Sequence, residues 1–177
     1  MESPSQKMRP VPEVVPPVLV LGLGNVLLGD DGVGCEVLRR TSEKYTGVPE
    51  VEFIDGGTQG LALLGYLAER RTLVLLDAFA SGKSPGEVTV LTKREILKPG
   101  ASRATTAHEG NAGELLAVAQ LLGELPQQVL LVGIEPERVR TELGLSVNVA
   151  AAVPAACDRA CEIIDHALCE CVALVCG

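Results

Sequence analysis

The sequence predicts an α/β fold with a mostly parallel central sheet, and three observations support this prediction. Short apolar runs alternate along the chain with segments of helical periodicity. Two of these runs, Val18–Leu23 and 73–76, contain no polar residue, which is typical of central strands buried on both faces. A later run, 87–91, alternates polar with apolar residues. This alternation indicates an edge strand with one solvated face, which we expect to be antiparallel.

The first half of the chain is expected to form strand–helix pairs. A helix over 32–45 should follow the first strand, because Val33, Val37 and Leu38 lie on one side of it. A second strand at 51–54 and a second helix at 59–69 should precede the strand at 73–76. The residues at 81–86 (SGKSPG) predict a turn before the edge strand.

The second half is expected to contain two helices and one more strand. The segment 93–104 is predicted to be irregular. Thr106 and Glu109 have the spacing of a capping box, so His108 should lie in the first turn of a helix that runs to about Gly123. A strand at 129–132 and a long helix at 148–169 should complete the fold, with Pro154 a candidate point for a break or kink in that helix.

Length and composition limit the classes of function. The 177 residues predict one domain over 18–170, a flexible tail at 1–17 with five prolines, and a C-terminal tail at 171–177. The apolar stretch at 14–28 is too short and too interrupted to span a bilayer, so we expect a cytoplasmic protein without a membrane partner. A net charge of −8 and 2% aromatic residues exclude a basic, base-stacking surface, so we expect no nucleic-acid partner. We expect a monomer.

Six cysteines allow two interpretations. Cys157 and Cys161 are four residues apart, so on a helix they would share a face and could bind a metal together. We favour the alternative that they are small buried residues of an alanine-rich helix. Cys35 could be a nucleophile, but Asp31 and Glu36 would raise the pKa of its thiol, so we place it in the core.

Acidic residues follow several of the predicted strands, at the edge where ligands bind in open α/β sheets. A single carboxylate at such a position is usually a helix cap or a turn residue. Several at one edge raise each other's pKa unless a cation or a proton relieves them. These residues are Asp30, Asp31, Asp55, Asp77 and Glu135, and we interpret the last as a cap of its strand.

Asp31, Asp77 and His108 would supply two oxygens and one nitrogen to a divalent metal and leave positions open for water or substrate. The alternative for His108 is a role in capping its helix. Asn25 is expected to brace its turn through hydrogen bonds to the backbone. The nearby glycines at 22, 24, 56 and 57 would allow close backbone approach.

Two other kinds of site are disfavoured. A dinucleotide fingerprint needs a third glycine where Leu27 stands, and acidic residues at the helix start would repel a pyrophosphate. A serine hydrolase would need a G-x-S-x-G elbow, and the sequence has none.

A set of motifs in fixed order covers roughly residues 18–145. With these motifs the sequence resembles the hydrogenase maturation proteases, endopeptidases that trim the large subunit of nickel–iron hydrogenases. The motifs are Gly22-x-Gly24-Asn25, Asp30-Asp31-Gly32-x-Gly34, Asp55-Gly56-Gly57-Thr58, Asp77-Ala78, His108 and Val132-Gly133-Ile134-Glu135-Pro136.

The resemblance implies a fold and a site. The fold would be a three-layer, flavodoxin-like or phosphorylase/hydrolase-like sandwich. The metal-contacting and catalytic residues would be Asp31, Asp77 and His108. The nickel would belong to the substrate rather than to the protease. The substrate loop would comprise Asn25, Asp55, Gly56, Gly57 and Thr58.

The function implied is that of an aspartic-type endopeptidase acting on a hydrogenase large-subunit precursor. It would remove a C-terminal extension after nickel insertion, by recognising the bound nickel. A non-catalytic nickel-binding maturation chaperone is the alternative from another class. A flavodoxin-like nucleotide or flavin binder is a third possibility, which the acidic rim and the missing glycine disfavour.

Overall fold

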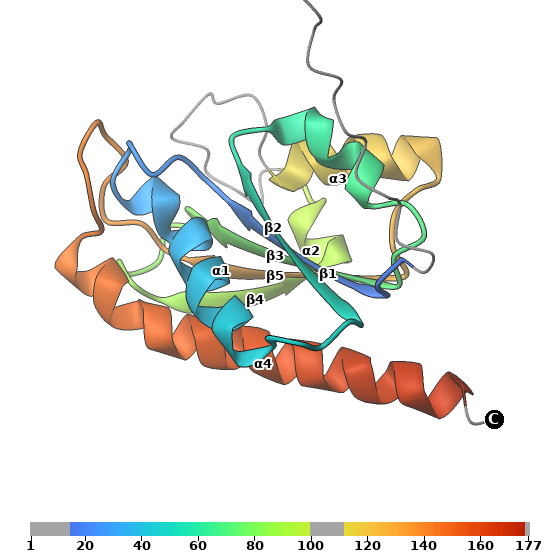
Figure 1. Cartoon of the computed structure of the whole chain (residues 1–177). Coiled ribbons are helices and arrows are strands. Elements are labelled where there is room, and N and C mark those ends of the chain that lie inside the picture. Colours follow the sequence, from blue (N-terminus) through green and yellow to red (C-terminus); the bar gives the residue numbers. More distant parts are fainter. Residues whose placement is uncertain (1–14, 100–111, 176–177) are drawn as a thin grey trace, which may run out of the picture.

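The computed structural model describes residues 15–99 and 112–175 as a five-stranded sheet between two layers of helices (Figure 1). The strand order is β2-β1-β3-β5-β4. Strands β1, β2, β3 and β5 are parallel, and β4 pairs antiparallel with β5 at the edge. The predicted mostly parallel sheet with an antiparallel edge strand is therefore confirmed. The strands are β1 (Val18–Leu23), β2 (Val51–Gly57), β3 (Thr72–Ala78), β4 (Val88–Thr92) and β5 (Gln128–Ile134).

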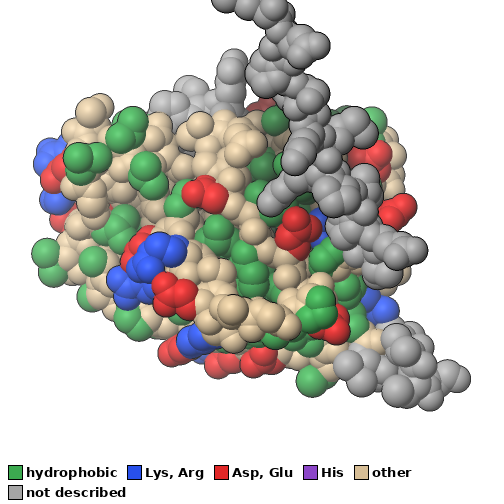
Figure 2. Space-filling view, viewed as in Figure 1, with side chains coloured by type: hydrophobic (Ala, Val, Ile, Leu, Met, Phe, Trp, Pro, Cys, Tyr) green, Lys and Arg blue, Asp and Glu red, His purple; other side chains and the backbone are tan. Residues whose placement is uncertain are grey.

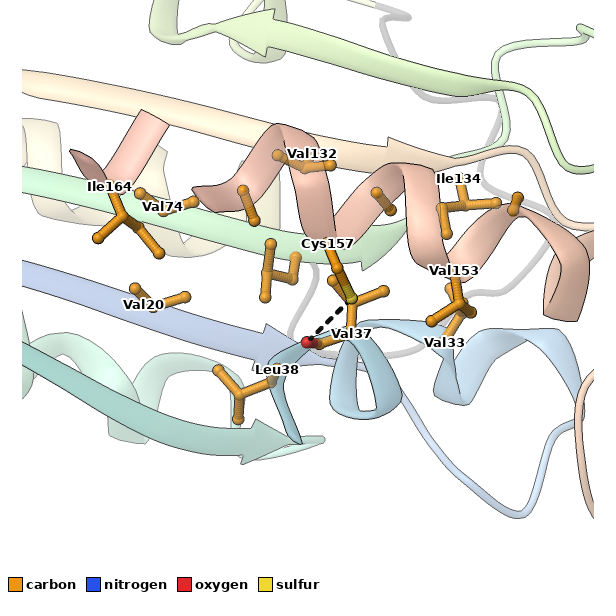
Figure 3. Packing of buried hydrophobic residues seen from close by; sticks show 14 of the residues in the cluster. Val20, Val33, Val37, Leu38, Val74, Val132, Ile134, Val153, Cys157 and Ile164 are labelled. Atoms are coloured by element: carbon orange, nitrogen blue, oxygen red, sulfur yellow. Dashed lines mark hydrogen bonds between the residues drawn. The ribbon is translucent and has the colours of Figure 1, made fainter. Parts of the chain in front are cut away.

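Alternating side chains of the central strands fill two separate cores. Val18 and Val20 of β1 point to one face, where α1 (Val33–Lys44) and α4 (Val147–Val175) pack. Figure 3 shows this core, with Cys157 of α4 among the aliphatic side chains. Leu19 and Leu21 point to the other face, which is covered by η2 (Gly60–Tyr66), α2 (Lys93–Ile96) and α3 (Ala112–Leu122). Both faces of β1 are buried, as its uniformly apolar sequence requires.

The structure differs from the predicted elements at three places, of which η2 and α2 come first along the chain. The segment predicted as a helix at 59–69 forms the 3₁₀ helix η2, whose seven residues include Gly60, at a φ of 53°, and Gly65. Two glycines in so short a segment disfavour a regular α-helix. The segment predicted as irregular begins with α2, which is capped by a Thr92–Glu95 capping box. This box has the same spacing as the Thr106–Glu109 pair, so the sequence carried the signal.

The last helix is longer than predicted. The long helix α4 runs without a break through Pro154 and continues to Val175. Cys157 is 5% exposed, and its Sγ donates to the carbonyl oxygen of Val37 at 3.8 Å (Figure 3). This confirms the structural interpretation of Cys157. Cys157 lies where α4 packs against α1, the helix that begins at the acidic edge.

Candidate active site

The sheet topology brings two acidic residues to either side of the end of β1. Gly22 is in register with Asp55 of β2 on one side and with Leu76 of β3 on the other. Asp77 follows Leu76 at the end of β3. Asp31 lies in η1 (Asp30–Gly32), between the turn that leaves β1 and the start of α1. The expectation that these residues meet at one edge follows from parallel strand pairing.

Two glycines set the geometry of the turn after β1. A Cβ atom at position 24 would lie 1.8 Å from the carbonyl oxygen of Asp31, and Gly24 has a φ of 119°. A Cβ atom at position 34 would lie 2.2 Å from the carbonyl oxygen of Leu76. Glycine at position 34 therefore lets the start of α1 approach the end of β3. This close packing brings the Asp31 turn towards Asp77.

Asn25 braces the same turn, as predicted. Its backbone N–H donates to Oδ2 of Asp31 at 2.8 Å. Its side-chain Oδ1 accepts from the backbone N–H of Leu27 at 2.9 Å, which forms an Asx turn. Asn25 thus fixes both the loop and the direction of the Asp31 carboxylate.

Asp77 titrates far from its ordinary range. Burial, together with the negative charge of Asp31, raises the pKa of Asp77 to about 8, although a hydrogen bond from the Ala78 backbone opposes the shift. Asp77 therefore retains its proton at neutral pH. The proton on Asp77 removes the repulsion between the two carboxylates, and a bound cation would remove the same repulsion.

Cys35 of α1 contacts the end of β2 at this edge of the sheet. The Cys35 Sγ donates to Oδ1 of Asp55 at 3.4 Å, and the same oxygen accepts from the backbone N–H of Gly57 at 3.1 Å. Burial, the charge and hydrogen bond of Asp55 and the charge of Asp77 raise the pKa of the Cys35 thiol to about 12. Cys35 is thus a protonated, half-buried donor at the rim. The prediction that it lies in the core was wrong, because α1 begins at the rim.

The Asp55–Thr58 segment forms the end of β2, beside the end of β1, and the residue that follows it. Gly56 is buried, and a Cβ atom there would lie 2.9 Å from Cδ1 of Leu63. Gly57 has a φ of 46° and its carbonyl oxygen accepts from the N–H of Gly24 at 3.0 Å. Thr58 is exposed. The predicted substrate loop is therefore joined to the turn that carries Asn25 and Asp31.

Comparisons with known proteins identify the family to which this chain belongs. The chain matches the hydrogenase maturation protease family over residues 35–163. It is 33% identical to the hydrogenase 2 maturation protease of Escherichia coli over 143 residues, and these cover 80% of this chain and 87% of that protein. The chain belongs to the hydrogenase maturation protease family. Members of this family are peptidases, so the chemistry to be explained is the hydrolysis of a peptide bond.

A second relative and a solved structure support the same assignment. The hydrogenase expression/formation protein HoxM of Cupriavidus necator is 34% identical over 122 residues, which cover 69% of this chain and 60% of that protein's length. The hydrogenase maturating endopeptidase HybD from E. coli superposes with a TM-score of 0.73 at 30% identity, over 84% of this chain and 92% of that one. The three-layer fold is thus that of a maturation protease.

Asp30, the immediate neighbour of Asp31, has a different role in this protease. It is fully buried, and its two oxygens accept four hydrogen bonds. Burial alone would raise its pKa, but hydrogen bonds from Ser146, Arg138 and Glu137 outweigh burial and lower the pKa of Asp30. Asp30 therefore ties the Asp31 turn to the loop after β5. These partners lie more than 100 residues away, so no local pattern revealed them.

Glu135 also proves to be a structural residue of the protease, but not the strand cap we expected. Its Oε2 accepts from the backbone N–H of Ser81 at 2.8 Å and from Oγ of Ser81 at 2.7 Å, and its Oε1 accepts from Gly82 at 3.1 Å. Burial opposes ionisation, yet these bonds lower the pKa of Glu135. It holds the loop that follows Asp77 and β3.

His108, the third predicted ligand, lies outside the described residues. Within residues 15–99 and 112–175, no three side chains of His, Cys, Asp or Glu come together as a metal-binding group. Asp31 and Asp77 therefore form the described part of the predicted set, and the role of His108 stays a prediction.

A cavity of about 450 Å³ lies between β4 and α4 and contains none of the predicted site residues. Its lining is Val88, Val90, Arg159, Glu162 and Ile163.

Of the helices in the described part of the chain, none has the length and apolar character needed to cross a membrane.

Proposed function

We propose that this protease removes a C-terminal extension from the large-subunit precursor of a nickel–iron hydrogenase, and that it recognises nickel bound to that precursor. The observation that carries the proposal is the Asp31–Asp77 pair, in which burial and the charge of Asp31 raise the pKa of Asp77 to about 8. The nickel is carried by the substrate, and Asp31, Asp77 and His108 would contact it.

The electrostatics of the pair supply a reason for selecting a nickel-loaded precursor. A nickel-free precursor would meet the ionised Asp31 and the protonated Asp77. A neutral peptide carries no cation that could displace the proton of Asp77. A divalent cation arriving with the substrate would lower the pKa of Asp77 and release its proton. Docking would then place the scissile bond beside the pair, and this proximity would supply much of the rate enhancement.

The hydrolytic step requires a water activated by the metal or by a carboxylate of this pair, with positive charge to stabilise the developing oxyanion. Asn25 would contribute by fixing the Asp31 carboxylate through its backbone N–H. The Cys35 thiol, with its pKa raised to about 12, would remain protonated and would not compete as a nucleophile.

The test is intact-mass analysis of a hydrogenase large-subunit precursor, nickel-loaded and nickel-free, incubated with the protease. We expect one short C-terminal peptide to be lost, only from the nickel-loaded precursor. Asp77→Asn and His108→Ala should each reduce the rate at least about a thousandfold, because each removes a group that acts on the reacting atoms. Glu124→Gln, which removes an exposed charge before β5, is the matched control and should cleave normally.

Two results would contradict the proposal. Full activity of Asp77→Asn would remove the carboxylate pair from the mechanism. An unchanged precursor mass, together with stoichiometric nickel retained by this protein alone, would favour the non-catalytic nickel chaperone.

A further inference from the structure

Four aliphatic side chains are exposed beside the Asp31 turn, three on loops and one at the start of α4. Val26 and Leu27, after β1, are 56% and 57% exposed, and Leu143, after β5, and Val147, the first residue of α4, are 79% and 84% exposed. We call these four residues the apolar platform. Figure 2 shows hydrophobic side chains at the left edge of the molecule, where Figure 1 places the loops after β1 and β5. Single exposed leucines are common, but several on adjoining loops indicate a contact surface.

Hydrogen bonds hold the two loops of the platform together. The N–H of Glu142 donates to the carbonyl oxygen of Leu27 at 3.1 Å, and the N–H of Gly29 donates to the carbonyl oxygen of Glu142 at 2.8 Å. The buried Asp30 carboxylate adds bonds to Arg138 and Ser146 at either end of the second loop. The aliphatic side chains are therefore presented on ordered backbone, which lowers the entropic cost of binding a partner.

The charged side chains around the platform neutralise one another. Nε of Arg138 lies 3.1 Å and Nε of Arg140 lies 2.9 Å from the Glu142 carboxylate. The Glu137 carboxylate lies 3.9 Å from Nη1 of Arg138 and also accepts from Nδ2 of Asn148 at 2.9 Å. Two arginines and two glutamates thus form a network without excess charge. The aliphatic side chains remain as the groups available to a partner, so the partner's matching surface should be apolar.

The platform is continuous with the carboxylate pair. Val26 and Leu27 lie between Asn25, which donates to Asp31, and Gly29. A Cβ atom at position 32, next to Asp31, would lie 2.7 Å from the Cα of Val26. Any large partner that covers the platform would therefore also reach Asp31. A second copy of this chain seated there would block the site, whereas a substrate must occupy both places.

We propose that the apolar platform binds an apolar segment of the precursor polypeptide next to the bond that is cut. This inference rests on the proposed function, because it assigns the substrate's position at the same site. Binding would hold the chain on one side of Asp31 while the nickel contacts the carboxylates on the other. The platform determines affinity for the precursor and takes no part in the bond-breaking step.

The test is a steady-state and binding comparison of wild type with the Leu27→Ser/Leu143→Ser double variant, on nickel-loaded precursor. We expect KM to rise about tenfold, since the variant lacks two exposed leucines that the precursor would cover on binding, with kcat changed less than about twofold. Leu121→Ser is the matched control, because Leu121 is 86% exposed on α3. Its KM should equal that of wild type, and the thermal midpoints of all three proteins should agree.

Direct binding separates the two proposals. The Kd of the precursor is measured by calorimetry with Asp77→Asn as background, so that no cleavage occurs. Cleavage by wild type with unchanged Kd and KM in the double variant would overturn the platform and leave the function intact. Binding that the double variant weakens, without cleavage by wild type, would support the platform and overturn the function. Sedimentation showing a dimer that only the double variant dissociates, with unchanged KM, would assign the platform to a second copy instead.

Discussion

Asp30 and Asp31 are adjacent in the chain and lie in opposite electrostatic environments. The Asp30 carboxylate is fully buried and accepts four hydrogen bonds, which outweigh burial and lower its pKa. The Asp31 carboxylate accepts a bond from the Asn25 backbone and faces Asp77, whose pKa it raises. Hydrogen-bond donors surround the Asp30 carboxylate, whereas the Asp31 carboxylate lies near a second carboxyl group, that of Asp77.

The difference separates a structural role from a chemical one. A buried charge surrounded by donors stabilises one conformation and is closed to a ligand from solvent. A pair of carboxylates with few donors has unused coordinating capacity and gains from a cation or a proton. Asp30 therefore fixes the position of the turn that carries Asp31, and Asp31 and Asp77 remain available for substrate.

The largest expected effect that tests this comparison is on stability. Asp30→Asn should lower the free energy of unfolding by about 3 kcal/mol, because the amide turns N–H groups towards backbone donors. Asp31→Asn should change it by less than about 1 kcal/mol, since it loses one accepted bond and also removes the charge that faces Asp77. Urea unfolding at pH 7 measures both. Equal destabilisation by the two variants would break the distinction.

The next effect is on the pH dependence of stability. An unfolded aspartate ionises near its ordinary pKa of 3.8, whereas folded Asp77 keeps its proton up to about pH 8. The folded state therefore binds more protons in this window, so Asp77 lowers stability as pH rises from about 4 to about 8. Each pKa unit corresponds to about 1.4 kcal/mol.

Asp77→Asn removes this dependence while other titrating groups remain. Between pH 5 and pH 8, wild type should lose about 3.5 kcal/mol more unfolding free energy than the variant. Urea unfolding at both pH values measures the difference. Parallel curves for the two proteins would show that Asp77 is ionised in the folded state throughout.

The smallest effect concerns the reactivity of Cys35, whose pKa depends on the carboxylates at the same edge. Because burial and the nearby carboxylates raise its pKa to about 12, its reaction with iodoacetamide at pH 8 should be at least about a hundredfold slower than that of exposed Cys169. Peptide mass spectrometry measures both sites in one sample. Asp55→Asn should speed the reaction of Cys35 and leave Cys169 unchanged. Equal rates at the two cysteines in wild type would contradict the environment described.

Much of the fold and part of the site follow from local sequence. The apolar run of β1 and the alternation of β4 predicted a central and an edge strand, because burial on two faces or one leaves different residue patterns. The positions of Asp31, Asp55 and Asp77 after parallel strands predicted that they share one edge. The sequence also carried the Thr92–Glu95 capping box, which the prediction of an irregular segment overlooked.

The roles of individual acidic residues depended on contacts made in the folded protein. Asp30 and Asp31 look alike in sequence. Arg138 and Ser146, over 100 residues away, donate hydrogen bonds to the Asp30 carboxylate and none to the Asp31 carboxylate. Glu135 is bound by the loop at Ser81, and Cys35 meets Asp55 across the rim. Sequence determined where the carboxylates stand along each strand. Tertiary structure decided which are neutralised, because pKa values depend on burial and on donors that distant segments supply.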